Sequence, residues 1–389
     1  MKNALLVLAA ILVSCLAFEA YLRAAGISYP ILHRLERERG WAPWPGIDGV
    51  YTTEGRARVR FNQDGIRGPA VGPGKGEDVY RIAVLGDSMT EAREVEEADT
   101  FVARVGTSLS GCGALEGKRV ETLNFGVSGY GTAQQLITLE RHVLGYGPDL
   151  VLLAFYAGND ISNNSRRLDG HLDRPYFVLS EGALVADRET LEGARFAAKY
   201  YRRNIWNGIV NRVRLFQFVR DTVNKARTGV RGKARHEPRF RAPSMEDMIF
   251  EPPSDEAWRE AWWVTERLLE EMGARAAAAG GRFMIAVLSV PVQVTPDKEA
   301  RREFMARLGI ESLFYVEERL ASFGERAGIP VIALGPPMQE IADRDGVFFH
   351  GFETSVLGDG HYNAQGHAVV ARLIAAGVCG RLSGGAGRR

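Results

Sequence analysis

Four short polar motifs follow strand-like apolar runs, and each holds a residue type that acyl-transfer chemistry uses. They are Gly86-Asp87-Ser88, the loop from Gly126 to Gly131, Gly158-Asn159-Asp160 and Asp359-Gly360-His361. Loops at the carboxyl ends of parallel strands share one edge of a sheet, so we expect these four motifs to meet in space. A serine nucleophile, a histidine base, an acid that orients the histidine and donors to an oxyanion are the parts of catalysis through an acyl-enzyme.

The elements that must position these motifs follow from the apolar pattern. Strand-like runs alternate with helical stripes, and the strands are expected at 80–85, 120–124, 150–155, 283–290 and 330–334, before a final helix at 364–376. This alternation predicts a three-layer α/β/α domain with five β/α units. Residues 161–253 interrupt the rhythm and are expected to form a large insertion after the third strand.

Within the insertion, 175–179 and 183–186 predict a β-hairpin, and residues 228–243 predict a basic loop. A single helix with one apolar stripe is expected from Trp206 to Val223, and Ser254 is a candidate N-cap for the helix that follows. Residues 26–78 form an N-terminal extension that ends in a Gly/Pro linker, and 381–389 form a C-terminal tail.

The first 25 residues predict a targeting or anchoring segment. Lys2 precedes an uncharged apolar run from Ala4 to Phe18, and a helix over residues 4–22 is about 28 Å long. We interpret residues 1–25 as an uncleaved signal anchor; the alternatives are a lipoprotein signal with Cys15 as the lipidated residue, and an ordinary cleaved signal peptide. Arginine residues after the run do not favour export by the positive-inside rule, although a large translocated domain can override that bias.

Charge and cysteine usage add weaker information. The net charge is +1 from 49 basic and 48 acidic residues, but residues 202–241 carry an excess of ten positive charges. That segment is either a solvated arm or a surface for an anionic glycan or phospholipid headgroup, and it lacks the interleaved aromatic residues of a nucleic-acid platform. In a sheet of order 2-1-3-4-5, Cys112 and Cys379 end helices on the same face, so a disulfide between them is geometrically reasonable; the alternative is two unrelated buried thiols.

The ordered set of motifs resembles the SGNH (GDSL-type) hydrolase superfamily, with its blocks lying between Gly86 and His367. Asn62-Gln-Asp-Gly-Ile-Arg67, after an N-terminal membrane segment, resembles bacterial envelope-associated members more narrowly. The resemblance implies a flavodoxin-like fold over residues 79–380, with about five parallel strands in the order 2-1-3-4-5. Met89 stands where the first block usually has leucine, and the last block is D-x-H rather than the commoner D-x-x-H.

The resemblance also implies a role for each motif residue. Ser88 is expected to be the nucleophile, His361 the base and Asp359 the acid that orients it, with His367 as the rival base. The backbone N–H groups of Ser88 and Gly129 and the side-chain amide of Asn159 are expected to form the oxyanion hole. No metal and no cofactor is expected.

The function that these residues favour is a serine esterase acting on O-acyl, mainly O-acetyl, groups of an envelope carbohydrate or lipid. The alternatives are an O-acetyltransferase that modifies an exopolysaccharide with the same triad, and a catalytically inactive envelope binding protein. The expected partners are an acylated glycan, lipid or small molecule and the inner membrane, without nucleic acid. The expected location is the bacterial cell envelope, with the catalytic domain outside the cytoplasm.

Overall fold

A five-stranded parallel sheet forms the centre of the protein. The computed structural model describes residues 2–180, 182–232 and 245–386. The strands are β5 (Val79–Gly86), β6 (Arg119–Asn124), β7 (Leu150–Tyr156), β10 (Arg282–Leu288) and β11 (Val331–Ala333). Their order is β6-β5-β7-β10-β11, and every neighbouring pair is parallel, which confirms the predicted order 2-1-3-4-5.

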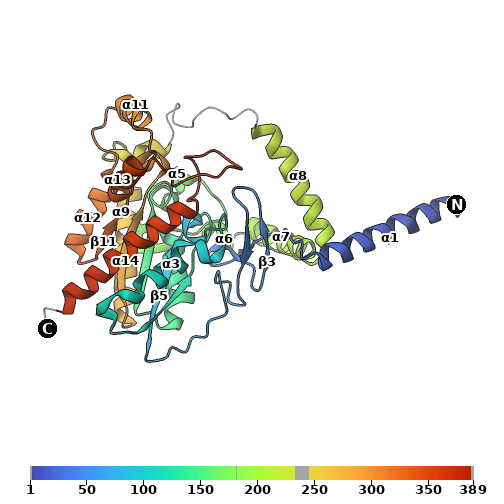
Figure 1. The fold of residues 1–389 in the computed structure, drawn as a ribbon, viewed down its shortest axis with the longest axis horizontal. Helices are drawn as coiled ribbons and strands as arrows, with labels where there is room; N and C mark the ends of the chain where they lie inside the picture. The colour runs from blue at the N-terminus through green and yellow to red at the C-terminus, as the bar shows by residue number, and fades with distance from the viewer. Residues whose placement is uncertain (1, 181, 233–244, 387–389) are drawn as a thin grey trace.

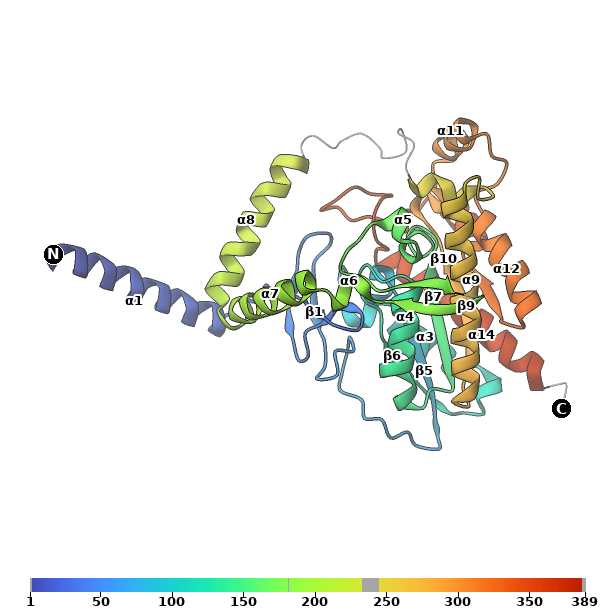
Figure 2. The same ribbon diagram turned by 180° about the vertical axis from the view of Figure 1, so that it is seen from behind.

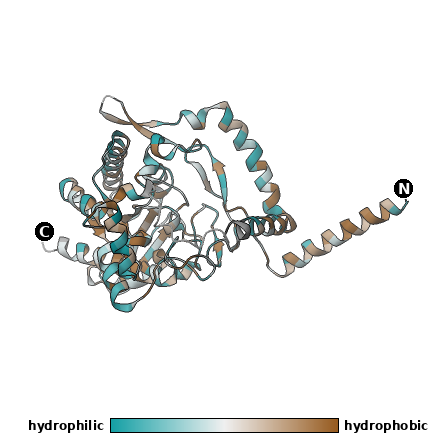
Figure 3. Cartoon of the chain, turned by 90° about the horizontal axis from the view of Figure 1, so that it is seen from above, coloured by the Kyte–Doolittle hydropathy of each residue, from teal (hydrophilic) through white to brown (hydrophobic). Residues whose placement is uncertain are grey.

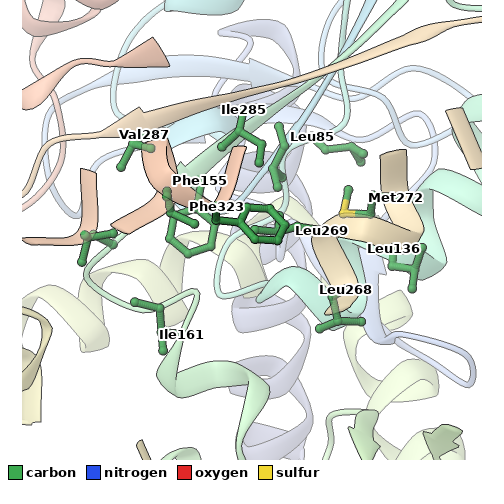
Figure 4. Packing of buried hydrophobic residues seen from close by; sticks show 14 of the residues in the cluster. Leu85, Leu136, Phe155, Ile161, Leu268, Leu269, Met272, Ile285, Val287 and Phe323 are labelled. Carbon is green, nitrogen blue, oxygen red and sulfur yellow. The ribbon is translucent and has the colours of Figure 1, made fainter. Parts of the chain in front are cut away.

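Helices cover both faces of this sheet, as Figures 1 and 2 show. One face packs against α4 (Thr132–Thr138), α9 (Glu256–Ala278) and α12 (Tyr315–Ala327), and the other against α3 (Phe101–Ser108), α13 (Gly335–Asp345) and α14 (Ala364–Ala386). The strands are apolar on both sides because both sides are covered. In Figure 4, Phe155 and Ile285 from the strands lie among Leu269, Met272 and Phe323 from the helices.

Two short hairpins precede the sheet. They are β1 (His33–Glu36) with β2 (Gly40–Pro43), and β3 (Asp48–Tyr51) with β4 (Ala57–Arg60). The β3–β4 hairpin and the segment after it contact the chain that follows Ser88, because the N–H of Arg58 donates to Glu96 and Arg67 donates to the backbone oxygens of Glu91 and Val95. The turn of this hairpin therefore lies beside the loop after the nucleophile motif.

The insertion after β7 differs from the expected single helix. It contains α5 (Arg166–Asp169), the hairpin of β8 (Tyr176–Ser180) and β9 (Ala183–Asp187), α6 (Glu189–Glu192), α7 (Ala194–Arg212) and α8 (Arg214–Gly232). The helix predicted across Trp206–Val223 is two helices, because the backbone of Val213 is extended (φ −114°, ψ 109°). The loop predicted at 228–243 begins later, since α8 continues to Gly232; residues 233–243 lie outside the described part of the chain.

The remaining elements are short or terminal. They are α1 (Lys2–Ala24), α2 (Ser88–Glu91), α10 (Pro291–Val294), α11 (Lys298–Leu308) and single 3₁₀ or π turns. The N-cap of α9 is Asp255 rather than Ser254, because the Asp255 carboxylate accepts from the N–H of Trp258. Beyond the sheet, Cys112 and Cys379 form a disulfide that joins the turn after α3 to α14.

The helix α1 is long and apolar enough to cross a membrane. It has 23 residues, and its most apolar 18-residue window has a mean hydropathy of 2.4 and is 6% buried. An N-terminal helix of this kind is compatible with either a signal sequence or a membrane anchor.

Candidate active site

The nucleophile motif lies at the carboxyl end of β5, in the middle of the sheet. The buried strand ends at Gly86, and Ser88 is the first residue of α2. A side chain at Gly86 would overlap the Thr90 hydroxyl, since a Cβ there would lie 2.1 Å from Thr90 Oγ1. The turn can therefore be tight enough to present Ser88 at the edge of the sheet, where its side chain is partly exposed.

A histidine from the far end of the sequence reaches this serine. His361 Nε2 lies 2.9 Å from Ser88 Oγ, across 273 residues of sequence. This distance is a hydrogen bond, and it is the geometry that a base needs to accept the hydroxyl proton. The structure thus brings Ser88 and His361 together.

The acid beside this histidine is Glu54, which the sequence analysis did not identify. Glu54 Oε2 lies 2.6 Å from His361 Nδ1, and Glu54 Oε1 accepts from the backbone N–H of His361 at 2.9 Å. Glu54 lies in the turn between β3 and β4, in the N-terminal extension. Two contacts from one carboxylate fix both the ring and the backbone of His361.

The expected pairing of Asp359 with His361 is corrected by this geometry. Asp359 Oδ1 instead accepts from the N–H of the next residue, Gly360, at 2.8 Å. With only Gly360 between them, the carboxylate of Asp359 closes a local turn rather than reaching the ring of His361. Gly360 leaves room for the true partner, because a Cβ there would lie 2.1 Å from Glu54 Oε1, and its φ of +81° also favours glycine.

The rival base, His367, lies in a different environment. It is buried in α14, and its Nδ1 accepts from the backbone N–H of Phe101. Burial, together with nearby positive charges, lowers the pKa of His367 to about 3. His367 is therefore a neutral packing and capping residue.

A second glutamate lies beside the same imidazole. The side chain of Glu94 is fully buried, and its Oε1 lies 3.7 Å from His361 Nδ1. Neither Glu94 oxygen has a hydrogen-bond partner within the described residues. Burial raises the pKa of Glu94, while the positive charge of His361 acts in the opposite direction.

These carboxylates set the protonation of His361. Burial lowers its pKa, but the hydrogen bond to Glu54 and the negative charges of Glu94, Glu54 and Asp87 outweigh burial and raise it to about 9. The pKa of Glu54 is lowered, because the bonds and charge of His361 exceed the effect of burial. The site thus stabilises the imidazolium, the form that His361 takes when it has accepted a proton.

The third motif is fixed to the first by a buried carboxylate. Asn159 Nδ2 donates to Asp87 Oδ2 at 2.8 Å, and Asp87 Oδ1 accepts from the N–H of Met89. Burial raises the pKa of Asp87, whose side chain has no solvent exposure. Asp87 therefore orients the Asn159 amide beside Ser88, and one amide hydrogen of Asn159 is left for another acceptor.

The second motif supplies a loop beside α2. Gly129 has a φ of +78°, and its carbonyl accepts from Arg174 Nη2 at 2.7 Å. The adjacent Ser128 donates its N–H and hydroxyl to Glu91, the last residue of α2. The N–H groups of Gly129 and Ser88 donate to no acceptor within the described residues, so both remain available to a bound anion.

One group of side chains in this site has the composition of a metal site. Ligand atoms of Glu54, Glu94 and His361 lie within 4.8 Å of one another, and this is the one such group among the described residues. Both nitrogens of His361 are already engaged, Nδ1 by Glu54 and Nε2 by Ser88. The donor set therefore fits a hydrogen-bonded relay better than metal coordination.

The structure therefore has the predicted strand order and brings Ser88 Oγ within hydrogen-bond distance of His361 Nε2 at the edge of the sheet. A hydroxyl, an imidazole and a carboxylate in this arrangement can carry out acyl transfer.

The comparisons with known proteins bear on the fold. No protein-family model and no curated protein matches the sequence. Solved structures that match include an α/β hydrolase from the metagenome of Lake Arreo, Spain, at 13% identity and a TM-score of 0.36, covering 78% of this chain and 96% of the other. A catalytic mutant of an acetylxylan esterase from Geobacillus stearothermophilus matches at 11% identity and 0.36, covering 77% and 94%.

A putative lipolytic protein of the G-D-S-L family from Desulfitobacterium hafniense matches at 10% identity and a TM-score of 0.35, covering 77% of this chain and 99% of the other. The identities are 10–13% and the TM-scores 0.35–0.36, so these matches do not assign a function to this chain. Its function has to be inferred from the residues of the site itself.

Proposed function

We propose that this protein is a serine esterase that removes O-acyl, principally O-acetyl, groups from an envelope carbohydrate or lipid. The observation that carries the proposal is the continuous relay from Ser88 Oγ through the His361 ring to Glu54. A serine that serves only as a helix cap has no need of a histidine oriented by two carboxylate contacts. We also propose that α1 anchors the catalytic domain on the outer side of the cytoplasmic membrane.

The chemistry follows from the positions of these groups. Ser88 Oγ attacks the ester carbonyl carbon while His361 Nε2 takes its proton, and Glu54 holds Nδ1–H and stabilises the imidazolium. The oxyanion is stabilised by the N–H groups of Ser88 and Gly129 and by the amide of Asn159. The tetrahedral intermediate expels the alcohol, which takes the proton from His361, and water then releases the acid from Ser88 by the same steps in reverse order.

The test uses the full chain in detergent, because Glu19 of α1 accepts from the N–H groups at the start of α8. Hydrolysis of p-nitrophenyl acetate and acetate release from an acetylated polysaccharide are measured for the wild type, Ser88→Ala and Ser110→Ala. Ser110 is an exposed serine in the turn after α3 and serves as the matched control. We expect loss of both activities in Ser88→Ala alone, and labelling of Ser88 by a serine-directed phosphonate.

Three outcomes contradict the proposal in different ways. Equal activity in Ser88→Ala and the wild type removes Ser88 from the reaction. Acetyl transfer to an added glycan, with little release to water, replaces the esterase with the transferase alternative. Absence of both labelling and turnover with every donor favours the binding protein.

A further inference from the structure

The helices α7 and α8 expose their apolar side chains. Tyr201, Ile205 and Ile209 repeat at intervals of four along α7, and their exposed fractions are 56%, 64% and 40%. On α8, Phe216 and Val219 are 44% and 51% exposed. The further exposed apolar side chains of the two helices are Trp206 and Val223. An amphipathic helix on the surface of a water-soluble domain buries its apolar stripe instead.

On α7, the side turned toward the body of the protein buries Phe196 and Val210 and also carries polar side chains. Asn204 accepts from the N–H of Leu35 and donates to its carbonyl, and Asn211 forms the same pair of bonds with Ile31. Asparagine side chains thus attach this helix to the backbone of the N-terminal extension.

The same arrangement occurs on α8. Gln217 is buried and accepts from the Ser28 hydroxyl and the N–H of Tyr29, while Arg220 donates to the carbonyl oxygen of Tyr29. Both helices therefore attach to the body in large part through amides and a guanidinium, while a row of apolar side chains faces outward.

The apolar helix α1 is fixed to the junction of these two helices. The Glu19 carboxylate accepts from the N–H groups of Arg214 and Leu215 at the start of α8, and Arg23 donates to the carbonyl of Arg212 at the end of α7. In Figures 1 and 2, α1 leaves the body at this junction, and α8 runs crosswise to α1 along the same side. A bilayer crossed by α1 therefore meets α8 along its length rather than at its tip.

The charge of this region fits an anionic surface. Residues 194–232 contain ten Lys or Arg and one acidic residue, Asp221, which pairs with Lys225 at 2.7 Å. Arg202, Arg203 and Arg212 are exposed beside the apolar side chains. Figure 3 shows hydrophobic residues along α1 and alternating hydrophobic and hydrophilic residues along α8. Helices with basic residues beside an apolar stripe bind in the headgroup region of anionic bilayers.

We propose that α8 and the adjoining C-terminal end of α7 form a docking arm that lies in the headgroup region of an anionic phospholipid bilayer, with their outward apolar side chains inserted and α1 crossing the same bilayer. The inference rests on the anchoring by α1 proposed above and is independent of the proposed hydrolysis. The bilayer is then the partner of both the basic and the apolar side chains of this region, because the C-terminal end of α1 is bound at the junction of α7 and α8.

The test is quenching of Trp206 by lipids brominated near the headgroup. The full chain is reconstituted in phosphatidylglycerol/phosphatidylcholine liposomes, and fluorescence with and without bromine is compared for the wild type, Trp206→Phe and Trp263→Phe. Trp263 lies on α9, and serves as the control. We expect bromine-dependent quenching that falls at least twofold in Trp206→Phe and is unchanged in Trp263→Phe. Equal quenching in the wild type and Trp206→Phe, or none in the wild type, overturns the proposal.

A second comparison tests the charge. We expect the paired change Arg202→Gln/Arg203→Gln to reduce Trp206 quenching in anionic liposomes, and Arg326→Gln, an exposed position on α12, to leave it unchanged. Trp206 emission that shifts with protein concentration and is insensitive to bromine replaces the lipid with a second copy of the chain, and so overturns the proposal.

Flotation and hydrolysis separate the possible failures. A chain that does not float with liposomes refutes anchoring by α1 and, with it, the arm. A chain that floats with Trp206 unquenched refutes the arm alone. Hydrolysis of p-nitrophenyl acetate, measured on the same samples, reports separately on the proposed reaction.

Discussion

Replacement of Glu54 by glutamine tests which acid serves His361. The introduced amide keeps an oxygen for the N–H of His361, but its NH₂ group facing Nδ1 favours the tautomer with the proton on Nε2, which cannot accept the proton of Ser88. Loss of the orienting acid in a serine triad costs ~10⁴ in kcat, and the charge of Glu94 at 3.7 Å offsets a part of this. We therefore expect a loss of about 10³–10⁴ in kcat, or about 4–5.5 kcal/mol in the barrier.

The matched control is Asp359→Asn, which retains an oxygen for the N–H of Gly360. We expect its kcat to remain within about threefold of the wild type, since the Asp359 carboxylate has no bond to the ring. Gly360→Ala should behave like Glu54→Gln, because its methyl group would overlap Glu54 Oε1. Thermal melts of each variant report whether the fold is retained. A larger loss in Asp359→Asn than in Glu54→Gln would refute the reasoning and restore Asp359 as the acid.

Three further predictions concern the same site and the scaffold. Asn159→Ala should lower kcat by ~10²–10³ with KM little changed, and an unchanged kcat removes the amide from the oxyanion hole. Because only neutral His361 is a base, kcat/KM should rise with pH toward the pKa of His361, which is about 9. Glu94→Gln removes a negative charge beside the ring and should move this rise to lower pH. An identical pH profile in the wild type and Glu94→Gln argues against coupling between Glu94 and His361. Reduction of the Cys112–Cys379 disulfide should lower the free energy of unfolding by about 2–5 kcal/mol, which a denaturant titration measures. The value of kcat should change little, because the bridge precedes β6 at the opposite edge of the sheet from Ser88, and an assay of the reduced protein checks this.

The folded-state pKa of His361 also predicts how stability depends on pH. Raised from 6.5 to about 9, it stabilises the folded protein fully below pH 6.5, and this contribution is lost as the pH rises through 9. The pH that favours catalysis thus lowers stability. Unfolding measured between pH 6 and 9.5, with the same slope in the wild type and His361→Gln, would contradict this account.

The sequence predicted the order of the sheet and the position of Ser88 at its edge, because both depend on local pattern. Long apolar runs between turn residues marked the strands, and the strand ends placed Ser88 and Asn159 at one edge. The D-x-H motif located His361 but not its acid. Glu54 lies in a hairpin turn of the extension, at no fixed spacing from the motifs, and only tertiary packing brings it to the ring. The short spacing between Asp359 and His361 was the one local sign that another acid was needed.

The insertion was harder to predict because its packing inverts the usual rule. A stripe such as Trp206, Ile209, Val213 and Phe216 predicts a helix that buries its apolar face, and the periodicity continues across the break at Val213. On the body side, amides that bind the backbone of the N-terminal extension supplement a few buried apolar side chains, and such amides carry no apolar signal. Periodicity identifies the amphipathic face, but it does not say whether protein or another apolar phase covers that face.

The N-terminal extension contacts both the candidate active site and the helices α7 and α8. Its segment from Ser28 to Leu35 forms hydrogen bonds with polar side chains of α7 and α8. In the β3–β4 hairpin that follows, Glu54 contacts His361. The sheet domain by itself supplies a serine and a histidine, but the acid comes from the same extension that holds the arm. If the two proposals hold, a change that displaces the extension should disturb both, because the β3–β4 turn places Glu54 at the ring of His361 and the segment before it binds α7 and α8.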